Sequence, residues 1–157
     1  MLRIGIGKDI HRVAAGRRFL LGGIEIPSEK GEEGHSDADV LIHAVIDAIL
    51  GATCLGDIGE LFPPGDLKWK DADSRELLRL AWDIVQKQGW KITGIDSVVT
   101  CEKPKILPHR DTIRESIAGI LGIDTETVFV KGKTAEGLDA IGRGEAVEAI
   151  AVCLLEK

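Results

Sequence analysis

The sequence predicts a single α+β domain (α/β layered), in which helices cover one face of a mixed β-sheet. Short apolar segments near both ends of the chain have the length and composition of strands. Three longer segments between them repeat apolar residues at helical spacing. A length of 157 residues fits one domain with a substantial core, so we expect residues 1–157 to form one domain.

The N-terminal segment is predicted to be a strand that ends on two polar side chains. Residues 2–6 alternate Leu and Ile with Arg and Gly, which is typical of a half-buried strand. Residues i and i+2 of a strand point to the same side, so Asp9 and His11 can share one small target. We expect Ile10, between them, to face the other way into a core.

The next segment predicts a strand pair and the first helix. Residues 18–21 and 24–26 flank two glycines and are typical of paired strands, whereas the polar residues 27–34 indicate a loop. Ser36 is a suitable N-cap for a helix that continues to about Gly51. On that helix Asp39, His43 and Asp47 share one stripe, with about 6 Å between neighbours along the axis.

The remaining elements follow from helical periodicity, apolar runs and Gly/Pro positions. We expect, in order, a loop at 56–66, a helix from Asp73-Ser74 to Gly89, a strand at 90–101, a loop at 102–109, a helix from Pro108 to Gly122, a strand at 128–131, a loop at 132–144 and a central strand at 145–155. Long loops such as 56–66 are often functional.

Composition restricts the classes of partner and compartment. The net charge is 20 − 26 = −6, which argues against a general nucleic-acid binder, although a small phosphorylated ligand needs only a local basic cluster. The three cysteines form no C-x-x-C pair, as in reduced cytosolic proteins. No apolar run approaches a membrane span, and the first residues lack a signal-peptide profile. We therefore expect a soluble, cytoplasmic protein without membrane or nucleic-acid partners.

Two sets of residues suggest binding of metal and phosphate. Asp9, His11 and His43 would give Zn²⁺ three ligands and leave a fourth position open, as catalytic zinc sites do. The alternative is that His43 is a helix histidine hydrogen-bonded in a packed interface. Five basic residues on or near the later loops could bind phosphate, or could simply be solvated: Lys103, Lys105, Lys131, Lys133 and Arg143.

Glu136 is a candidate ligand for Mg²⁺, which often takes one or two carboxylates and completes its octahedron from substrate phosphates. It could equally be an exposed loop glutamate. The sequence contains no G-x-S-x-G motif, no evident Cys–His pair and no Walker loop, so no protein nucleophile is indicated.

The motifs taken together resemble those of the 2-C-methyl-D-erythritol 2,4-cyclodiphosphate synthase family. The matching pieces occur in the family's order and cover essentially the whole chain. They are Asp9-Ile10-His11; His35-Ser36-Asp37-Ala38-Asp39 with His43; Gly56-Asp57-Ile58-Gly59; Leu61-Phe62-Pro63; Ala72-Asp73-Ser74-Arg75-Glu76-Leu77-Leu78; Pro104-Lys105-Ile106-Leu107-Pro108; Thr134-Ala135-Glu136; and Gly142-Arg143-Gly144-Glu145.

The resemblance implies a cyclising phosphorus–oxygen lyase of non-mevalonate isoprenoid precursor biosynthesis. Its substrate would be 4-diphosphocytidyl-2-C-methyl-D-erythritol 2-phosphate, whose 2-phosphate attacks the β-phosphorus of its own diphosphate. The products would be 2-C-methyl-D-erythritol 2,4-cyclodiphosphate and CMP. A substrate that supplies its own nucleophile agrees with a sequence that indicates none, and leaves the enzyme to position groups and neutralise charge.

Site roles implied by the resemblance fall into three groups. Asp9, His11 and His43 would bind Zn²⁺ or another divalent transition metal, and Glu136 would bind Mg²⁺ or Mn²⁺ through the substrate phosphates. His35 and Thr134 would stabilise the transition state as catalytic residues. The other implied substrate contacts are Ser36 at the methylerythritol phosphate; Asp57, Ile58, Gly59, Phe62 and Asp66 around the sugar; Cys101, Lys105, Ile106 and Leu107 around cytosine and phosphate; and Lys133, Ala135 and Arg143.

The family also implies a homotrimer with active sites between subunits and an apolar channel on the threefold axis. Lys8 and Ala140 stand where relatives often carry aromatic residues beside that channel, although Arg143 and Glu145 match. These departures argue against an isoprenoid diphosphate on the axis. Two other classes remain as alternatives: a zinc phosphohydrolase that uses metal-bound hydroxide, and a non-catalytic trimer clamped by metal.

Overall fold

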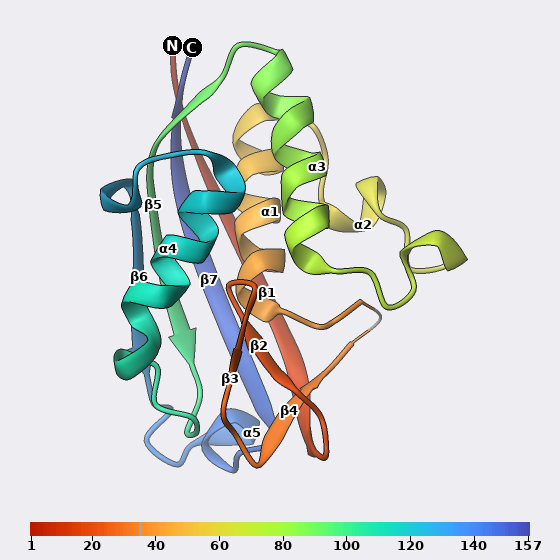
Figure 1. The fold of residues 1–157 in the computed structure, drawn as a ribbon, viewed down its shortest axis with the longest axis vertical. Helices are drawn as coiled ribbons and strands as arrows, with labels where there is room; N and C mark the ends of the chain where they lie inside the picture. Colours follow the sequence, from red (N-terminus) through yellow and green to blue (C-terminus); the bar gives the residue numbers. More distant parts are fainter. Residues whose placement is uncertain (35) are drawn as a thin grey trace.

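A computed structural model describes residues 1–34 and 36–157, and within these ranges a mixed sheet forms the centre of the fold (Figure 1). Its strands lie in the order β4-β1-β7-β5-β6. Only β5 and β6 are parallel among the pairs recorded in this sheet. The strand bounds are β1 (Leu2–Ala15), β4 (Lys30–Glu33), β5 (Lys91–Thr100), β6 (Val128–Lys133) and β7 (Ala146–Glu156). A separate hairpin pairs β2 (Phe19–Leu21) with β3 (Ile24–Ile26).

Three longer helices cover one face of this sheet (Figure 1). They are α1 (Val40–Thr53), α3 (Ser74–Lys87) and α4 (Arg110–Leu121). The shorter elements are α2 (Ile58–Leu61), α5 (Asp139–Gly142) and the 3-10 turns η1 (Leu67–Trp69), η2 (Leu107–His109) and η3 (Thr125–Thr127). The predicted layered α+β class, with a mixed sheet and helices on one face, is confirmed. No helix in the two described ranges is long and apolar enough to cross a membrane.

Two glycines of β1 allow α1 to rest directly on the sheet. A Cβ atom on Gly5 would lie 1.9 Å from the carbonyl oxygen of Ala48, and one on Gly7 would lie 1.9 Å from that of Ala44. Any larger residue would push the helix away from the strand. The close approach places His43, one residue before Ala44, beside the stretch of β1 that carries Asp9 and His11.

The isoleucines of β1 lie on its outer side, so the prediction that Ile10 faces a core is wrong. Ile4, Ile6 and Ile10 are 73%, 69% and 51% exposed, respectively. The alternation of the strand is as predicted, but its inner side carries the glycines followed by Asp9 and His11. Because α1 packs against glycine, the isoleucines point away from every helix that covers the sheet.

The predicted loop at 27–34 contains a strand, because β4 pairs antiparallel with the end of β1. The pairing of Val13 with Glu32 uses backbone groups, so the polar sequence gave no sign of it. The predicted Ser36 cap is also wrong: α1 begins at Val40, and its N-cap Asp39 accepts a hydrogen bond from the Ile42 N–H (3.0 Å). Asp39 also accepts from Gly22 N–H (3.0 Å) and Gly23 N–H (2.6 Å), which joins the β2–β3 turn to α1.

Most other elements match their predictions. The β2–β3 pair, α3, β5, α4 and β6 occur where expected, and β7 is the central strand of the sheet. Within the predicted loops at 56–66 and 132–144 the structure adds the single-turn helices α2 and α5. The N-terminal strand is longer than predicted because β1 pairs with β7 from Leu2 to Arg12.

Candidate functional site

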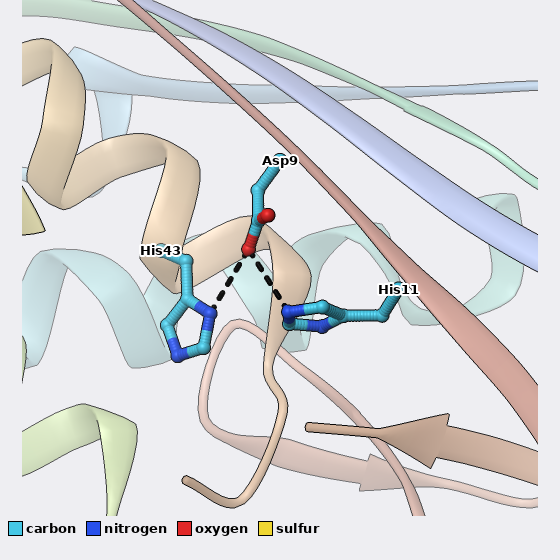
Figure 2. Close-up of side chains that lie close together, drawn as sticks. All are labelled: Asp9, His11 and His43. Atoms are coloured by element: carbon cyan, nitrogen blue, oxygen red, sulfur yellow. Dashed lines mark hydrogen bonds and ion pairs between the residues drawn. The ribbon is translucent and has the colours of Figure 1, made fainter. Parts of the chain in front are cut away.

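Asp9 and His11 from β1 and His43 from α1 converge on one point (Figure 2). The Asp9 carboxylate oxygen Oδ2 lies 3.1 Å from His11 Nε2 and 3.0 Å from His43 Nδ1. The three potential ligand atoms all lie within 4.8 Å of one another. Asp9 and His11 are two positions apart on β1, so both point inward. The helix α1 rests on two glycines of the same strand, which brings His43 beside them.

The surroundings of His11 fix which ring nitrogen is free to bind a metal. Its Nδ1 lies 2.7 Å from the carbonyl oxygen of Ala38, which can only accept. Nδ1 therefore keeps its proton, and Nε2, which faces the centre of the site, is the nitrogen that can give up a proton and bind a metal. Ala38 has a φ of +66°, a left-handed conformation that is uncommon for alanine and that occurs here at the residue holding the ring.

A hydrogen-bonded chain orients His43 in the same manner. Its Nε2 lies 3.1 Å from the Ser74 hydroxyl, and that hydroxyl donates in turn to Asp37 Oδ1. Since the Ser74 proton goes to the carboxylate, the Ser74 oxygen accepts from His43 Nε2–H. The Ser36 hydroxyl lies 2.9 Å from the same nitrogen. This leaves Nδ1, which faces Asp9 at 3.0 Å, as the nitrogen of His43 that can bind a metal.

The electrostatics of the site favour a positive charge at its centre. Burial alone would lower the pKa of His11, but hydrogen bonds with Asp9 and Glu32 raise it to about 10. Burial alone would raise the pKa of Asp9, but hydrogen bonds from His11 and His43 hold that pKa well below its usual range. A proton therefore occupies, in the chain alone, a position that a cation would take over.

The donor set fits a divalent metal. Two imidazole nitrogens and one carboxylate oxygen are ligands that zinc and related ions accept, and three protein ligands leave a position for a substrate atom. Both histidines have their second nitrogen hydrogen-bonded, as metal-bound histidines generally do. These features support a divalent-metal site at Asp9, His11 and His43.

A buried glutamate, Glu32 of β4, lies behind His11. Its Oε2 accepts from the Val40 N–H (2.9 Å) and is 3.3 Å from His11 Nδ1. Burial raises the pKa of Glu32 to about 8, although the hydrogen bond with His11 opposes the shift.

The loop residues expected at the sugar lie beside α1. Asp47, one turn beyond His43 on that helix, accepts from the Ile58 N–H at 2.8 Å. Asp57 caps α2 by accepting from the Glu60 N–H at 2.8 Å. The segment 57–59 is therefore attached to the helix that carries His43.

Two further expected contacts, Phe62 and Asp66, are engaged within their own loop. The Phe62 ring packs edge-on against Trp69, with ring centroids 4.9 Å apart, and is largely buried. Asp66 caps η1 by accepting from the Lys68 N–H at 2.9 Å. These contacts order the loop, and neither residue contacts the three convergent side chains by a recorded hydrogen bond.

A second group of expected contacts surrounds one cavity of about 300 Å³. The lining includes all four of the residues expected around cytosine and phosphate, together with their neighbours: Cys101, Glu102, Pro104, Lys105, Ile106, Leu107, Arg110, Gly132, Lys133 and Thr134. Burial raises the pKa of the Cys101 thiol to about 12, so this group is neutral near pH 7 and is not a thiolate nucleophile.

The loop after β6 carries the last expected site residues. Glu102 Oε1 accepts from the Ala135 N–H (2.9 Å), which ties this loop to the rim of the cavity. Glu136 is exposed, has a φ of +53° and accepts from the Thr134 hydroxyl at 2.9 Å. The exposed Arg143 pairs with Glu145 at 3.1 Å. No recorded hydrogen bond or ion pair between described residues joins this loop or the cavity to Asp9, His11 and His43.

The remaining predictions concern His35 and the axial residues Lys8 and Ala140. His35 lies outside the described residues. Lys8 is on the outer side of β1, where it pairs with Glu148 at 2.9 Å, and Ala140 is half-buried on α5. A larger cavity of about 480 Å³ lies elsewhere, between the ends of α3, β5 and α4, and contains no residue of the convergent group.

Three residues that surround the histidines were not predicted to contribute to the metal site: Glu32, Asp37 and Ser74. Asp37 and Ser74 lie inside the motifs of the resemblance, so their positions were visible although their link to His43 was not. Glu32 had no such signal, because it lies in a polar segment expected to be a loop.

Comparisons with known proteins agree on one family. The model of the YgbB family matches residues 2–156. A protein of Treponema denticola named 2-C-methyl-D-erythritol 2,4-cyclodiphosphate synthase is 56% identical over 154 residues, covering 98% of this chain and 96% of that protein.

Two solved structures share the fold. A 2C-methyl-D-erythritol-2,4-cyclodiphosphate synthase in its CDP-bound form has a TM-score of 0.91 and 40% identity, covering 98% of this chain and 100% of that one. The bifunctional IspDF of Campylobacter jejuni has a TM-score of 0.95 and 40% identity over 99% of this chain, which spans 42% of that longer protein.

Proposed function

The chain belongs to the YgbB family, and we propose that it catalyses the reaction for which its relatives are named, the synthesis of 2-C-methyl-D-erythritol 2,4-cyclodiphosphate for isoprenoid biosynthesis. The observation that carries the proposal is the convergence of Asp9, His11 and His43, whose ligand atoms lie within 4.8 Å of one another. Residues 1–157 would act as one such domain. The substrate would be 4-diphosphocytidyl-2-C-methyl-D-erythritol 2-phosphate.

The covalent step would take place within the substrate. An oxygen of the 2-phosphate attacks the β-phosphorus and forms a new phosphorus–oxygen bond. The bond from that phosphorus to the oxygen bridging the α-phosphate breaks, so CMP leaves with its electron pair and the eight-membered cyclic diphosphate remains. Water takes no part. The protein is left to hold the two phosphates in line and to balance their charge.

The convergent site would hold Zn²⁺ through Asp9 Oδ, His11 Nε2 and His43 Nδ1. A divalent ion bound there supplies positive charge and Lewis acidity to phosphate oxygens. Asp9 would contribute the one formal negative charge among the three ligands. The hydrogen bonds from His11 Nδ1–H to Ala38 and from His43 Nε2–H to Ser74 would keep both rings oriented before the substrate enters.

The cavity beside Cys101 would receive the cytidine portion. A relative of the same fold is known in a CDP-bound form, which supports a cytidine nucleotide as the ligand class. The volume of about 300 Å³ is suited to a flat base. Lys105 and Lys133 on its lining would meet phosphate oxygens.

The Thr134 hydroxyl and the Glu136 carboxylate, at the edge of this cavity, would face the diphosphate. Thr134 lines the cavity, and its hydroxyl already contacts Glu136. Glu136 is exposed and could offer its carboxylate to a Mg²⁺ or Mn²⁺ ion shared with the phosphates. His35 and Thr134 remain the proposed groups for stabilising the transition state.

A homotrimer with sites between subunits is supported by the uncovered face of the sheet. Cross-strand partners share a face, and the register Ile6–Val152–Asp96–Phe129 runs across four strands on the side opposite the helices. Large apolar residues on this side are exposed in the single chain: Leu2, Ile4, Ile6, Ile10, Phe129 and Leu154. An apolar patch of this kind marks an interaction surface, and we propose two further copies of the chain as its partners.

The proposal is tested by following the reaction in water enriched in ¹⁸O. Phosphorus NMR should show the two coupled signals of a cyclic diphosphate, together with CMP in equal amount. Mass spectrometry should find no ¹⁸O in either product. If ¹⁸O enters a phosphate and open monophosphates appear, the chain is a metal-dependent hydrolase and the proposal is wrong.

A further inference from the structure

Glu32 is a buried carboxylate with no assigned role in the proposed reaction. Its residue is 4% exposed, and its side chain is fully enclosed. Only one of its two oxygens has hydrogen-bond partners: among the described residues Oε1 has none. Burial of a carboxylate with an incompletely paired oxygen costs stability, so packing alone does not account for a glutamate at this position.

The backbone holds Glu32 in a fixed place. Its N–H donates to the carbonyl oxygen of Arg18 at 3.1 Å, and it is paired with Val13 of β1. Gly31, the residue before it, allows β4 to pass closely, because a Cβ atom there would lie 2.1 Å from the Arg18 carbonyl oxygen. The glutamate side chain therefore reaches the interior from a strand rather than from a free loop.

The carboxylate lies on the side of His11 that faces away from the metal ligands. His11 Nδ1 is 2.7 Å from the Ala38 carbonyl oxygen and 3.3 Å from Glu32 Oε2, so its single N–H is shared between two acceptors. His11 Nε2, across the ring, faces Asp9 at 3.1 Å. Carboxylates in this position behind a metal-bound histidine hold the ring and strengthen its donor nitrogen.

We propose that Glu32 is a positioning residue for the divalent ion, forming a carboxylate–histidine–metal arrangement through His11. This inference rests on the proposed metal site. It adds a group that never touches the ion or the substrate but sets how strongly the ion is held.

Glu32 Oε2 also accepts from the Val40 N–H at the start of α1. A purely structural role for Glu32 therefore predicts a loss of stability on substitution rather than weaker metal binding. Glu32→Gln separates the two roles, since the amide oxygen can still accept from Val40 while the carboxyl group behind His11 is lost. The matched control is Glu33→Gln, which makes the same chemical change at the next residue of β4, where the side chain is exposed.

The test measures the dissociation constant of Zn²⁺ by competition with a chromophoric chelator, without any activity assay. We expect Glu32→Gln to bind Zn²⁺ about 10- to 100-fold more weakly than the unmodified chain, with Glu33→Gln unchanged. Thermal unfolding of the metal-free forms should place Glu32→Gln close to the unmodified chain. Equal Zn²⁺ affinity in all three proteins would overturn the inference. No Zn²⁺ binding by the unmodified chain would instead overturn the metal site itself.

Should Glu32→Gln fail to fold, Glu32→Asp provides the same test, because it keeps the carboxyl group but withdraws it from His11 by one methylene. An affinity below that of the unmodified chain is the expected result, and an unchanged affinity would contradict the proposed role.

Discussion

The Ser74 hydroxyl accepts a hydrogen bond from His43 Nε2–H at 3.1 Å and donates its own hydrogen bond to the Asp37 carboxylate. Ser74 is completely buried, so it cannot reach a substrate as a nucleophile. Its location at the start of α3 means that one helix orients the proposed metal ligand on another. The contact explains why Nδ1 of His43, and not Nε2, faces Asp9.

Ser74→Ala should weaken metal binding while leaving the ligands in place. Loss of the acceptor frees the His43 ring to turn, and we expect about a 10- to 100-fold weaker Zn²⁺ affinity. The control is Ser97→Ala, which removes another buried hydroxyl, bonded to the Phe129 carbonyl oxygen in the sheet. Both variants should lose about 1 kcal/mol of unfolding free energy. Equal Zn²⁺ affinity in the two would show that Ser36 alone is sufficient to orient the ring.

His43→Ala should remove bound zinc and abolish turnover, because two ligands remain on β1 and none on α1. Metal content after dialysis, measured by inductively coupled plasma mass spectrometry, reports the change directly. His109→Ala is the matched control, since that histidine lies at η2 and is not part of the convergent group. Stoichiometric zinc in His43→Ala would remove this residue from the site.

Metal affinity should rise with pH, because the ion displaces the proton that His11 holds in the metal-free chain. The pKa of His11 there is raised to about 10, so at pH 7 to 8 close to one proton should leave per ion bound. Calorimetric titrations in buffers of different ionisation enthalpy count that proton. A count near zero over this pH range would show that His11 is already neutral.

The raised pKa of His11 also makes the stability of the metal-free chain depend on pH. A raised folded-state pKa contributes stability that is fully present below the unfolded value near 6.5 and is lost as pH rises toward 10. The lowered pKa of Asp9 contributes stability above its unfolded value of 3.8 that is lost on further acidification. The metal-free protein should therefore be most stable, as regards this pair, between about pH 4 and 6.5. Chemical denaturation across the pH range measures this, and a maximum above pH 8 would disagree.

Glu136→Gln should raise the Mg²⁺ requirement and leave zinc content unaltered. The amide keeps the size of the side chain and can still accept from Thr134, so only the charge offered to the ion is lost. We expect the Mg²⁺ concentration for half-maximal rate to rise at least about tenfold, equivalent to about 1.4 kcal/mol. Glu126→Gln, an exposed residue of η3, is the control. An unchanged Mg²⁺ requirement would exclude Glu136 as a ligand.

Ile6→Glu should break the assembly, since it places a charge in the uncovered apolar face of the sheet. Sedimentation should give a trimer for the unmodified chain and a smaller species for the variant, with activity lost if the sites lie between subunits. Ile84→Glu introduces the same change at an exposed position of α3, on the helical side, and should remain trimeric. A monomer that is fully active would contradict the interfacial site.

The sequence predicted the layered class and most elements because their signals are local. Helical spacing identified α3 and α4, and the long apolar run identified β7 as the central strand. The i, i+2 spacing of Asp9 and His11 correctly placed both on one side of β1. The sequence could not show on which side of β1 the core lies. The helix α1 packs against two glycines of the strand, whereas Ile10 was expected to face the core.

The unpredicted parts of the site depend on contacts between distant segments. Strand β4 forms through backbone pairing with β1, so the polar residues around Glu32 carried no strand pattern. The link from Asp37 through Ser74 to His43 joins residues that are 37 and 31 positions apart, and only the packing of α1 against α3 creates it. Neither feature has a spacing rule that a single sequence could reveal.

The proposed chemistry depends on one divalent ion held between β1 and α1. Diffraction data collected on either side of the zinc absorption edge, from crystals grown with Zn²⁺, locate that ion directly. The account predicts one anomalous peak per chain, about 2.0–2.2 Å from Asp9 Oδ, His11 Nε2 and His43 Nδ1. An ordered site with no peak among these three atoms, or a zinc ion held elsewhere in an active enzyme, would contradict it.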